Sequence, residues 1–152
     1  MENNISIVFD AKSQNESLAR MVVSAFLTEL DPTIEEMNDI KTAVSEAVTN
    51  SIIHGYGEKP GQVFMKCNLK RDDEKEDSLL QIEIQDKGVG IEDIEKAKEP
   101  LYTTKPELER SGMGFMFMEM FMDKIHIESE KNVGTTVFMT KKIKDNKKNR
   151  SR

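Results

Sequence analysis

Glu46 and Asn50 stand four residues apart in an otherwise apolar helical stretch. That spacing places both side chains on one face of a helix, about one turn from each other. Burying them without partners is costly, and Mg²⁺ shared with substrate phosphates would supply a partner. Asn50 could then give its carbonyl oxygen to the metal, and Glu46 could polarise a water or hydroxyl that attacks a γ-phosphate. The alternative is that both are solvated residues at the helix edge.

A second block, Asp86-Lys87-Gly88-Val89-Gly90, follows a strand-like run. Glycines let a backbone approach a flat ligand closely, and the carboxylate of Asp86 could accept a hydrogen bond from an exocyclic amine such as that of adenine. The alternative is an ordinary Asp-x-Gly turn.

A third block, Ser111-Gly112-Met113-Gly114, precedes an apolar, methionine-rich segment. Glycines at a helix start free backbone N–H groups to meet phosphate oxygens, aided by the helix dipole. The spacing matches neither the Walker A loop nor Gly-x-Gly-x-x-Gly. We interpret the methionines and phenylalanines that follow as core or interface residues.

These blocks must be positioned by regular elements. Alternation predicts strands at 4–9, 62–69, 79–85, 124–130 and 135–140, with a charged turn making a hairpin of the second and third. Helical periodicity predicts helices at 15–30, 34–54 and 113–122, plus a short helix and a loop within 92–110. Thr33 and Glu36 predict a capping box, and Gly55 a glycine C-cap. We expect an α+β two-layer sandwich, with helices on one face of a mostly antiparallel, mixed sheet.

The length of 152 residues is sufficient for one domain, which we expect to span 1–142, followed by a basic tail at 143–152. From Lys141 onward there are seven basic residues and one acidic residue, whereas the rest of the chain has 15 basic and 27 acidic residues. An acidic body argues against direct nucleic-acid binding. The tail is interpreted as a solvated terminus, with contact to an acidic partner as the alternative.

Other classes are disfavoured by composition. No apolar run reaches the length of a membrane span, and the first residues lack the pattern of a signal peptide. The single Cys67 cannot form an internal disulfide and is interpreted as a small buried residue. We therefore expect a cytoplasmic protein without a membrane partner.

Taken together, Glu-x-x-x-Asn, Asp-x-Gly-x-Gly, Gly-x-Gly and a final Gly134-Thr135 resemble the N, G1, G2 and terminal Gly-Thr elements of the GHKL ATPase/kinase superfamily. The likeness covers about residues 35–140 in the order expected of that superfamily, which includes gyrase, Hsp90, histidine kinases and MutL. It implies the Bergerat fold of ATP-binding domains.

Three longer segments are similar to the SpoIIAB family of sporulation anti-sigma factors and extend the resemblance over almost the whole chain. They are Ser45–Gly57, Pro100–Gly114 and the run Asn15-Glu16-Ser17-x-Ala19-Arg20. Such proteins hold the RNA polymerase sigma factor sigma-F inactive as ATP-bound homodimers. They also phosphorylate a serine of the anti-anti-sigma factor SpoIIAA.

The resemblance assigns roles to individual positions. It makes Glu46 the general base and Asn50 the Mg²⁺ ligand of an ATP site. Residues at the adenine end would be Asp86, Gly88, Gly90 and Thr135. The stretch 101–110 would be a lid with Thr104 and Lys105 as its phosphate contacts and Gly112 and Gly114 as its hinge. Glu16 and Arg20, on the first helix, would face sigma-F and SpoIIAA.

Two alternatives remain beside a serine kinase that inhibits a sigma factor. One is a non-catalytic, ATP-dependent sigma-binding module of the same fold, although Glu46 has no obvious use without turnover. The other is an ATPase clamp of the gyrase or Hsp90 kind, ranked last because we expect no transducing domain. We expect neither His54 nor His126 to be a phospho-acceptor.

Overall fold

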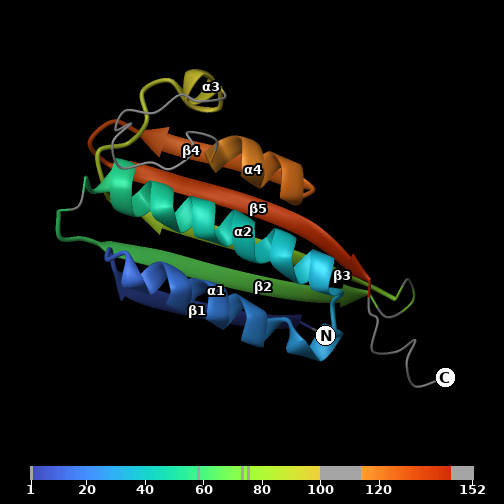
Figure 1. The fold of residues 1–152 in the computed structure, drawn as a ribbon. Coiled ribbons are helices and arrows are strands. Elements are labelled where there is room, and N and C mark those ends of the chain that lie inside the picture. The colour runs from blue at the N-terminus through green and yellow to red at the C-terminus, as the bar shows by residue number, and fades with distance from the viewer. Residues whose placement is uncertain (1, 58, 73, 75, 100–113, 145–152) are drawn as a thin grey trace.

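Five strands form a single sheet in the order β1-β2-β3-β5-β4 (Figure 1). The computed structural model describes residues 2–57, 59–72, 74, 76–99 and 114–144. The strands are β1 Glu2–Asp10, β2 Gln62–Asp72, β3 Asp77–Asp86, β4 Lys124–Glu130 and β5 Gly134–Lys144. All four pairings within these ranges are antiparallel, so the expected α+β class is confirmed, whereas the expectation of a mixed sheet is wrong for this part of the chain.

Helices cover one face of this sheet (Figure 1). They are α1 Gln14–Phe26, α2 Ile34–Asn50 and α4 Gly114–Phe121, with a 3₁₀ turn at Thr28–Leu30 and a π-helical turn at Ser51–Gly55. The short helix α3 Ile94–Ala97 lies apart from this layer, beside the β4 side of the sheet (Figure 1). Helix α2 lies between α1 and α4 and packs against both. None of the described helices is long and apolar enough to cross a bilayer.

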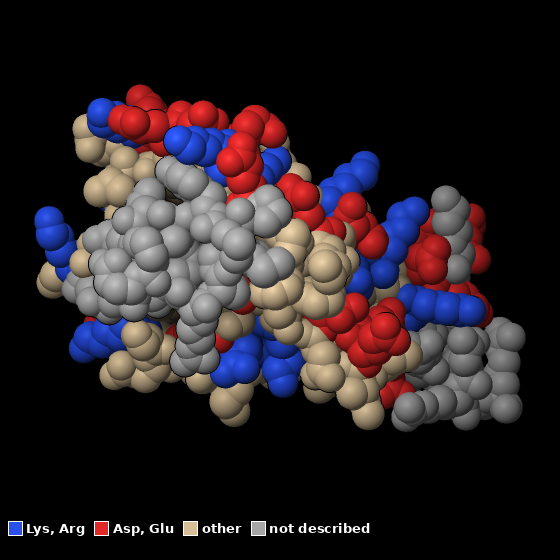
Figure 2. Space-filling view, turned by 45° about the horizontal axis from the view of Figure 1, so that its top comes forward, with Lys and Arg blue, Asp and Glu red and all other residues tan. Residues whose placement is uncertain are grey.

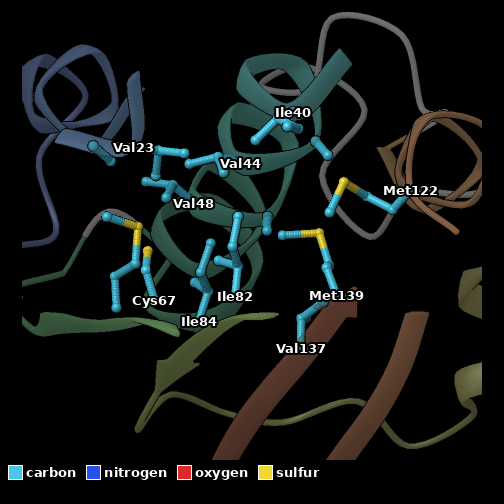
Figure 3. Close-up of a cluster of buried hydrophobic side chains, with 14 of the residues drawn as sticks. Val23, Ile40, Val44, Val48, Cys67, Ile82, Ile84, Met122, Val137 and Met139 are labelled. Atoms are coloured by element: carbon cyan, nitrogen blue, oxygen red, sulfur yellow. The ribbon is translucent and has the colours of Figure 1, made fainter. Parts of the chain in front are cut away.

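The core lies between this helical layer and the sheet. Strand β3 alternates between buried and half-buried positions along its whole length, which is the pattern of a central strand with one covered face. Helix α2 contributes Ile40, Val44 and Val48 to the interface, and the strands contribute Ile82, Ile84 and Met139 (Figure 3). The thiol of Cys67 lies in this core, and burial raises its pKa to about 12.

Four of the five described strands are longer than periodicity predicts, and β4 has the range that was predicted. The β2–β3 hairpin extends the ladder to the pair Asp72 and Asp77, so the charged turn is short. Strand β5 continues to Lys144 and buries Ile143 completely, so the folded part passes the boundary expected at residue 142. The tail from 145 onward is outside the described residues.

The first helix is shorter than expected. Helix α1 ends at Phe26, and the chain tightens into the 3₁₀ turn before Asp31 adopts a left-handed conformation with φ 48°. Asp31 precedes Pro32, and a residue before proline is disfavoured in the α region. No side-chain cap forms at the N-terminus of α1: the N-cap residue Ser13 makes no capping bond, and Asn15 donates to the carbonyl of Asp10 at 2.9 Å.

The start of helix α2 agrees with the sequence prediction, whereas its end does not. At the start the capping box is confirmed: the Glu36 N–H donates to Thr33 Oγ1 at 3.0 Å, and the Thr33 N–H donates to Glu36 Oε1 at 2.9 Å. At the other end the prediction of a C-cap at Gly55 is wrong. The helix widens into the π-helical turn, and Gly57, with φ 60°, takes the left-handed conformation.

Acidic and basic side chains are interspersed on the face shown in Figure 2. The described residues on that face form no continuous basic surface. Nucleic-acid binding proteins concentrate positive charge on the contact face, and the arrangement seen here differs from that pattern.

Replacing Thr33 tests the capping box. Thr33→Ala should lower the free energy of unfolding by about 1 kcal/mol, because it removes the acceptor of the Glu36 N–H. Thr33→Ser is the matched control, since it keeps the hydroxyl and should stay close to wild type. Urea denaturation of the three proteins measures the effect, and equal losses in both variants would contradict it.

Candidate functional site

A cavity of about 560 Å³ opens beside the end of α2. Its size lies within the range of small-molecule sites, about 300–1,000 Å³. The walls come from the end of α2, the loop after β3, α3, the start of α4 and the β4–β5 turn. Asn50, Asp86, Gly90, Gly114 and Thr135 are the predicted site residues that line it. The structure therefore gathers residues from three separate blocks around one cavity.

Glu46 and Asn50 meet at the first residue of α4. A methyl group placed on Gly114 would lie 3.2 Å from Oε2 of Glu46 and 3.5 Å from Oδ1 of Asn50. Helix α2 holds both side chains here because Ala47 and Val48, between them in sequence, are completely buried. Glycine at position 114 leaves this approach open, so the carboxylate and the carboxamide stand together at the start of a helix.

The Asn50 side chain has an unsatisfied polar atom. Its Nδ2 is buried and has no hydrogen-bond partner among the described residues. A buried amide of this kind is costly unless a ligand or ion completes it. Rotation of the amide can present either its oxygen or its nitrogen. The site therefore fits Mg²⁺ shared with phosphate oxygens, because that ion needs few protein ligands when a substrate supplies others.

Asp86 is a buried carboxylate, only 4% exposed. Burial is the largest influence and raises the pKa of Asp86 above the usual value, while hydrogen bonds from the Gly88 N–H, the Ser51 hydroxyl and the Thr135 N–H act in the opposite direction. The bond from Gly88 to Asp86 Oδ1 is 3.0 Å long. Three donors thus hold a desolvated carboxylate at the cavity wall, in place to read one polar group of a ligand.

The glycines around Asp86 are required by contacts within the protein. A methyl group on Gly88 would lie 2.0 Å from the carbonyl oxygen of Gly55, and one on Gly134 would lie 2.1 Å from the carbonyl oxygen of Asp86. Gly90 has φ 78°, and its methyl group would lie 2.3 Å from the carbonyl oxygen of Glu130. Gly88 does not line the cavity, whereas Gly90 does. Backbone-to-backbone packing within the protein therefore requires glycine at these positions.

Other predicted residues are only partly placed. Thr104, Lys105 and Gly112, together with the lid expected at 101–110, lie outside the described residues. Thr135 is buried at the start of β5 and pairs with Asp86 in the β3–β5 ladder. Glu46 does not line the cavity but reaches its edge at Gly114.

Several residues at the site were not anticipated. Ser51 and Ser129 bond to Asp86 and to Thr135 respectively, and Tyr56 bonds to the turn after β3. At the mouth, Lys131 and Glu92 form an exposed ion pair at 2.6 Å. The hydrogen bond between them lowers the pKa of Glu92 and raises that of Lys131. Of these residues, Tyr56 is the one whose position in the sequence pointed to the site, because it directly follows the His54-Gly55 pair at the predicted helix end.

Glu16 and Arg20 lie on α1, away from this cavity. Their side chains form an ion pair at 3.0 Å, and Glu16 Oε1 also accepts a hydrogen bond from the hydroxyl of Ser45 on α2. Arg20 lines a second, smaller hollow of about 210 Å³ with Lys41, Asn38, Thr42 and Ser45. The carboxylate of Glu16 is thus engaged within the protein, while Arg20 borders an open groove.

Comparison with known proteins agrees with this geometry. A family model described as a histidine kinase-like ATPase domain matches residues 9–141. A solved structure of the RsbU and RsbW domains of Rv1364c from Mycobacterium tuberculosis has the same fold, with a TM-score of 0.61 at 18% identity over 93% of this chain. This chain spans 32% of the length of that structure.

Curated relatives match over nearly their full length. The anti-sigma F factor of Clostridium acetobutylicum is 58% identical over 94% of this chain and 96% of its own. Those of Geobacillus thermodenitrificans and Clostridium perfringens are 53% and 54% identical and cover 97% and 94% of this chain, which in turn covers 97% and 99% of theirs. The resemblance deduced from the sequence blocks is confirmed: the chain belongs to the anti-sigma F factor family and carries a histidine kinase-like ATPase domain.

Proposed function

We propose that this protein is a cytoplasmic anti-sigma factor that binds and inhibits sigma-F and phosphorylates a serine of SpoIIAA with Mg²⁺-ATP. Membership of the anti-sigma F factor family supports the regulatory part of this proposal. The observation that carries the kinase part is the meeting of Glu46 and Asn50 at Gly114, on the edge of the cavity that Asp86 lines. A binding module alone would not need a carboxylate at that point.

Glu46 is the proposed general base. Its carboxylate accepts the proton of the attacking serine hydroxyl, the serine oxygen forms a bond to the γ-phosphorus, and the bond from that phosphorus to the bridging oxygen breaks, so ADP leaves. Glu46 lies on a helix whose inner face is completely buried. Such a rigid support is what orientation of a base requires.

Asn50 is the proposed side chain that holds the metal. Bound Mg²⁺ would neutralise the negative charge that develops on the phosphate oxygens. The buried amide of Asn50 supports this role, because turning the amide over aims its oxygen to where the unpartnered Nδ2 now lies. No group of three His, Cys, Asp or Glu side chains suitable for a metal occurs among the described residues, so the ion would depend on the nucleotide for further ligands.

Asp86 is the proposed reader of the base. Its ionised carboxylate accepts a hydrogen bond from the 6-amino group of adenine and disfavours a base with an oxygen at that position. The site thereby selects ATP by one buried acceptor. A single polar group of this kind can discriminate well, because a mismatched partner leaves it unpaired.

Arg20 is the proposed contact for the protein partners. It borders a groove with Lys41, and the ion pair with Glu16 fixes the direction of its guanidinium group. Two cations in a small groove suit an acidic side chain of sigma-F or SpoIIAA. Glu16 then acts chiefly by orienting Arg20.

We further propose a homodimer formed near β1 and α1. Strand β1 is at the edge of the sheet, and an edge strand presents unpaired backbone groups. Helix α1 exposes Met21, which is 69% accessible. These features make this end of the molecule a suitable surface for a second copy.

Replacing Glu46 separates the kinase from the binding module. Glu46→Gln should lower the rate of phosphate transfer to SpoIIAA by about 100-fold or more, because an amide cannot accept the serine proton. Binding of Mg²⁺-ATP and sigma-F should persist. The measurements are transfer from γ-labelled ATP and titration with each partner.

Glu35→Gln is the matched control for that experiment. Glu35 is exposed in the first turn of the same helix, so this variant loses the same charge away from the cavity. Transfer by Glu46→Gln at the rate of the control would contradict the role of general base, whereas a lack of transfer by the wild-type protein would favour the non-catalytic module.

The raised pKa of Asp86 predicts how base selectivity depends on pH. At neutral pH the ionised carboxylate should favour ATP over inosine triphosphate (ITP) by roughly tenfold or more. As pH falls through the pKa of Asp86, the protonated group can donate to the 6-oxygen of inosine, so the preference should decline. Because burial raises this pKa, the decline should begin at a higher pH than for an exposed aspartate.

Titration calorimetry with both nucleotides from about pH 8 to about pH 5 measures this ratio. The triphosphate groups of ATP and ITP ionise equally, so their ionisation changes both dissociation constants by the same factor and leaves the ratio unchanged. Asp86→Asn should show a ratio that does not change with pH. A wild-type ratio that is equally insensitive would rule out Asp86 as the reader.

A further inference from the structure

The hydroxyl groups of Tyr56 and Ser129 hold the two ends of the loop 86–91, which follows β3. The N–H of Lys87 donates to the phenolic oxygen of Tyr56 at 2.8 Å. The N–H of Ile91 donates to Oγ of Ser129 at 2.7 Å. Neither Tyr56 nor Ser129 is among the described residues that line the cavity, so both bind the loop without facing the cavity.

Tyr56 joins the end of β3 to the start of β2. Its hydroxyl accepts the Lys87 N–H and donates to the carbonyl of Gln62 at 2.5 Å. Its ring lies so close to Gly61 that a methyl group there would be 2.4 Å from Cε1. The Lys87 ammonium lies 5.0 Å from the ring centroid of Phe64. The residue next to Asp86 is therefore fixed through both its backbone and its side chain.

Ser129 joins the other end of the loop to β5. Its Oγ lies 2.7 Å from Oγ1 of Thr135 and 3.1 Å from the carbonyl oxygen of Gly134. The N–H of Thr135 is one of the three donors to Asp86. Ser129 thus connects the strand that binds the carboxylate with the loop that follows it.

Apart from the bond of the Gly88 N–H to Oδ1 of Asp86, the middle of the loop is held by backbone bonds. The N–H of Val89 donates to the carbonyl of Gly55 at 2.9 Å, and the carbonyl of Val89 accepts the N–H of Asn132 at 2.7 Å. Among the described residues, the two end attachments are the ones that use side chains other than Asp86, so substitution can remove them while the carboxylate and the backbone bonds stay in place.

We propose that Tyr56 and Ser129 are positioning residues that set base selectivity, by holding the loop so that Asp86 meets the 6-amino group of the nucleotide. The inference rests on the proposed ATP site. A reading carboxylate must be held to within about 0.5 Å of its productive position. The three donors fix Asp86 relative to its neighbours, and the two hydroxyls fix those neighbours relative to the strands.

The experiment compares Tyr56→Phe and Ser129→Ala with wild type and with Thr28→Val. Phenylalanine keeps the ring against Gly61 and removes only the hydroxyl. Thr28 is the control, because its hydroxyl also makes one hydrogen bond, 2.7 Å to the carbonyl of Ala25, but lies in the 3₁₀ turn after α1. Dissociation constants for ATP and ITP at neutral pH are measured for each protein, together with thermal unfolding.

Each of the two variants should bind ATP about three- to tenfold more weakly, the effect of losing one hydrogen bond. Binding of ITP should change less, so the ratio between the two nucleotides should fall. The control should keep the wild-type ratio even where its melting temperature drops. The two variants remove independent attachments, so misfolding of one leaves the other as the test.

Two results would overturn the inference while leaving the ATP site intact. One is wild-type affinity for ATP in both variants. The other is equal weakening for ATP and ITP, which would reveal a purely structural role. Failure of the wild-type protein itself to bind ATP would instead overturn the proposed function, and the inference with it.

Discussion

Burial of the Asp86 carboxylate is the constraint on which the site depends. A desolvated carboxylate needs donors on several sides, and here they come from the loop, from α2's terminal turn and from β5. Because the pKa of Asp86 is raised in the fold, its cost to stability is absent below the pKa of an unfolded aspartate. That cost grows as pH rises above the unfolded pKa and is complete above the folded one. At neutral pH the fold therefore bears a penalty at the wall of the cavity.

The same constraint explains why three segments distant in sequence must pack backbone against backbone. Gly55 approaches Asp86 so closely that a methyl group on it would lie 2.8 Å from the carboxyl carbon. Gly88 rests on Gly55, and Gly134 rests on the carbonyl of Asp86. The π-helical turn at the end of α2 delivers Gly55 to this junction. The helix that carries Glu46 and Asn50 is thereby tied to the strand that carries Asp86.

The sequence was informative where local chemistry repeats. Alternation located the five strands that the structure describes, the Thr33 and Glu36 pair located the start of α2, and the order of three polar and glycine blocks located the cavity. The sequence did not predict the contacts that depend on hydrogen bonds between residues distant along the chain. The bonds of Ser51, Tyr56 and Ser129 join loops to strands with no periodic signal. The widening of α2 into a π-helical turn was likewise hidden, because its residues continue the helical pattern.

The single buried cysteine gives this chain a natural reporter of its own unfolding. Only 1% of the surface of Cys67 is accessible, and a thiol with a pKa of about 12 is almost wholly protonated at neutral pH. Because the thiolate is the reactive form, a soluble alkylating reagent should modify the chain mainly through molecules that have opened the core between the sheet and α2. The alkylation rate then follows the opening equilibrium, and a ligand that binds only the closed form slows it in proportion to its occupancy. Ligand affinity can thus be followed on the unmodified protein without an added probe.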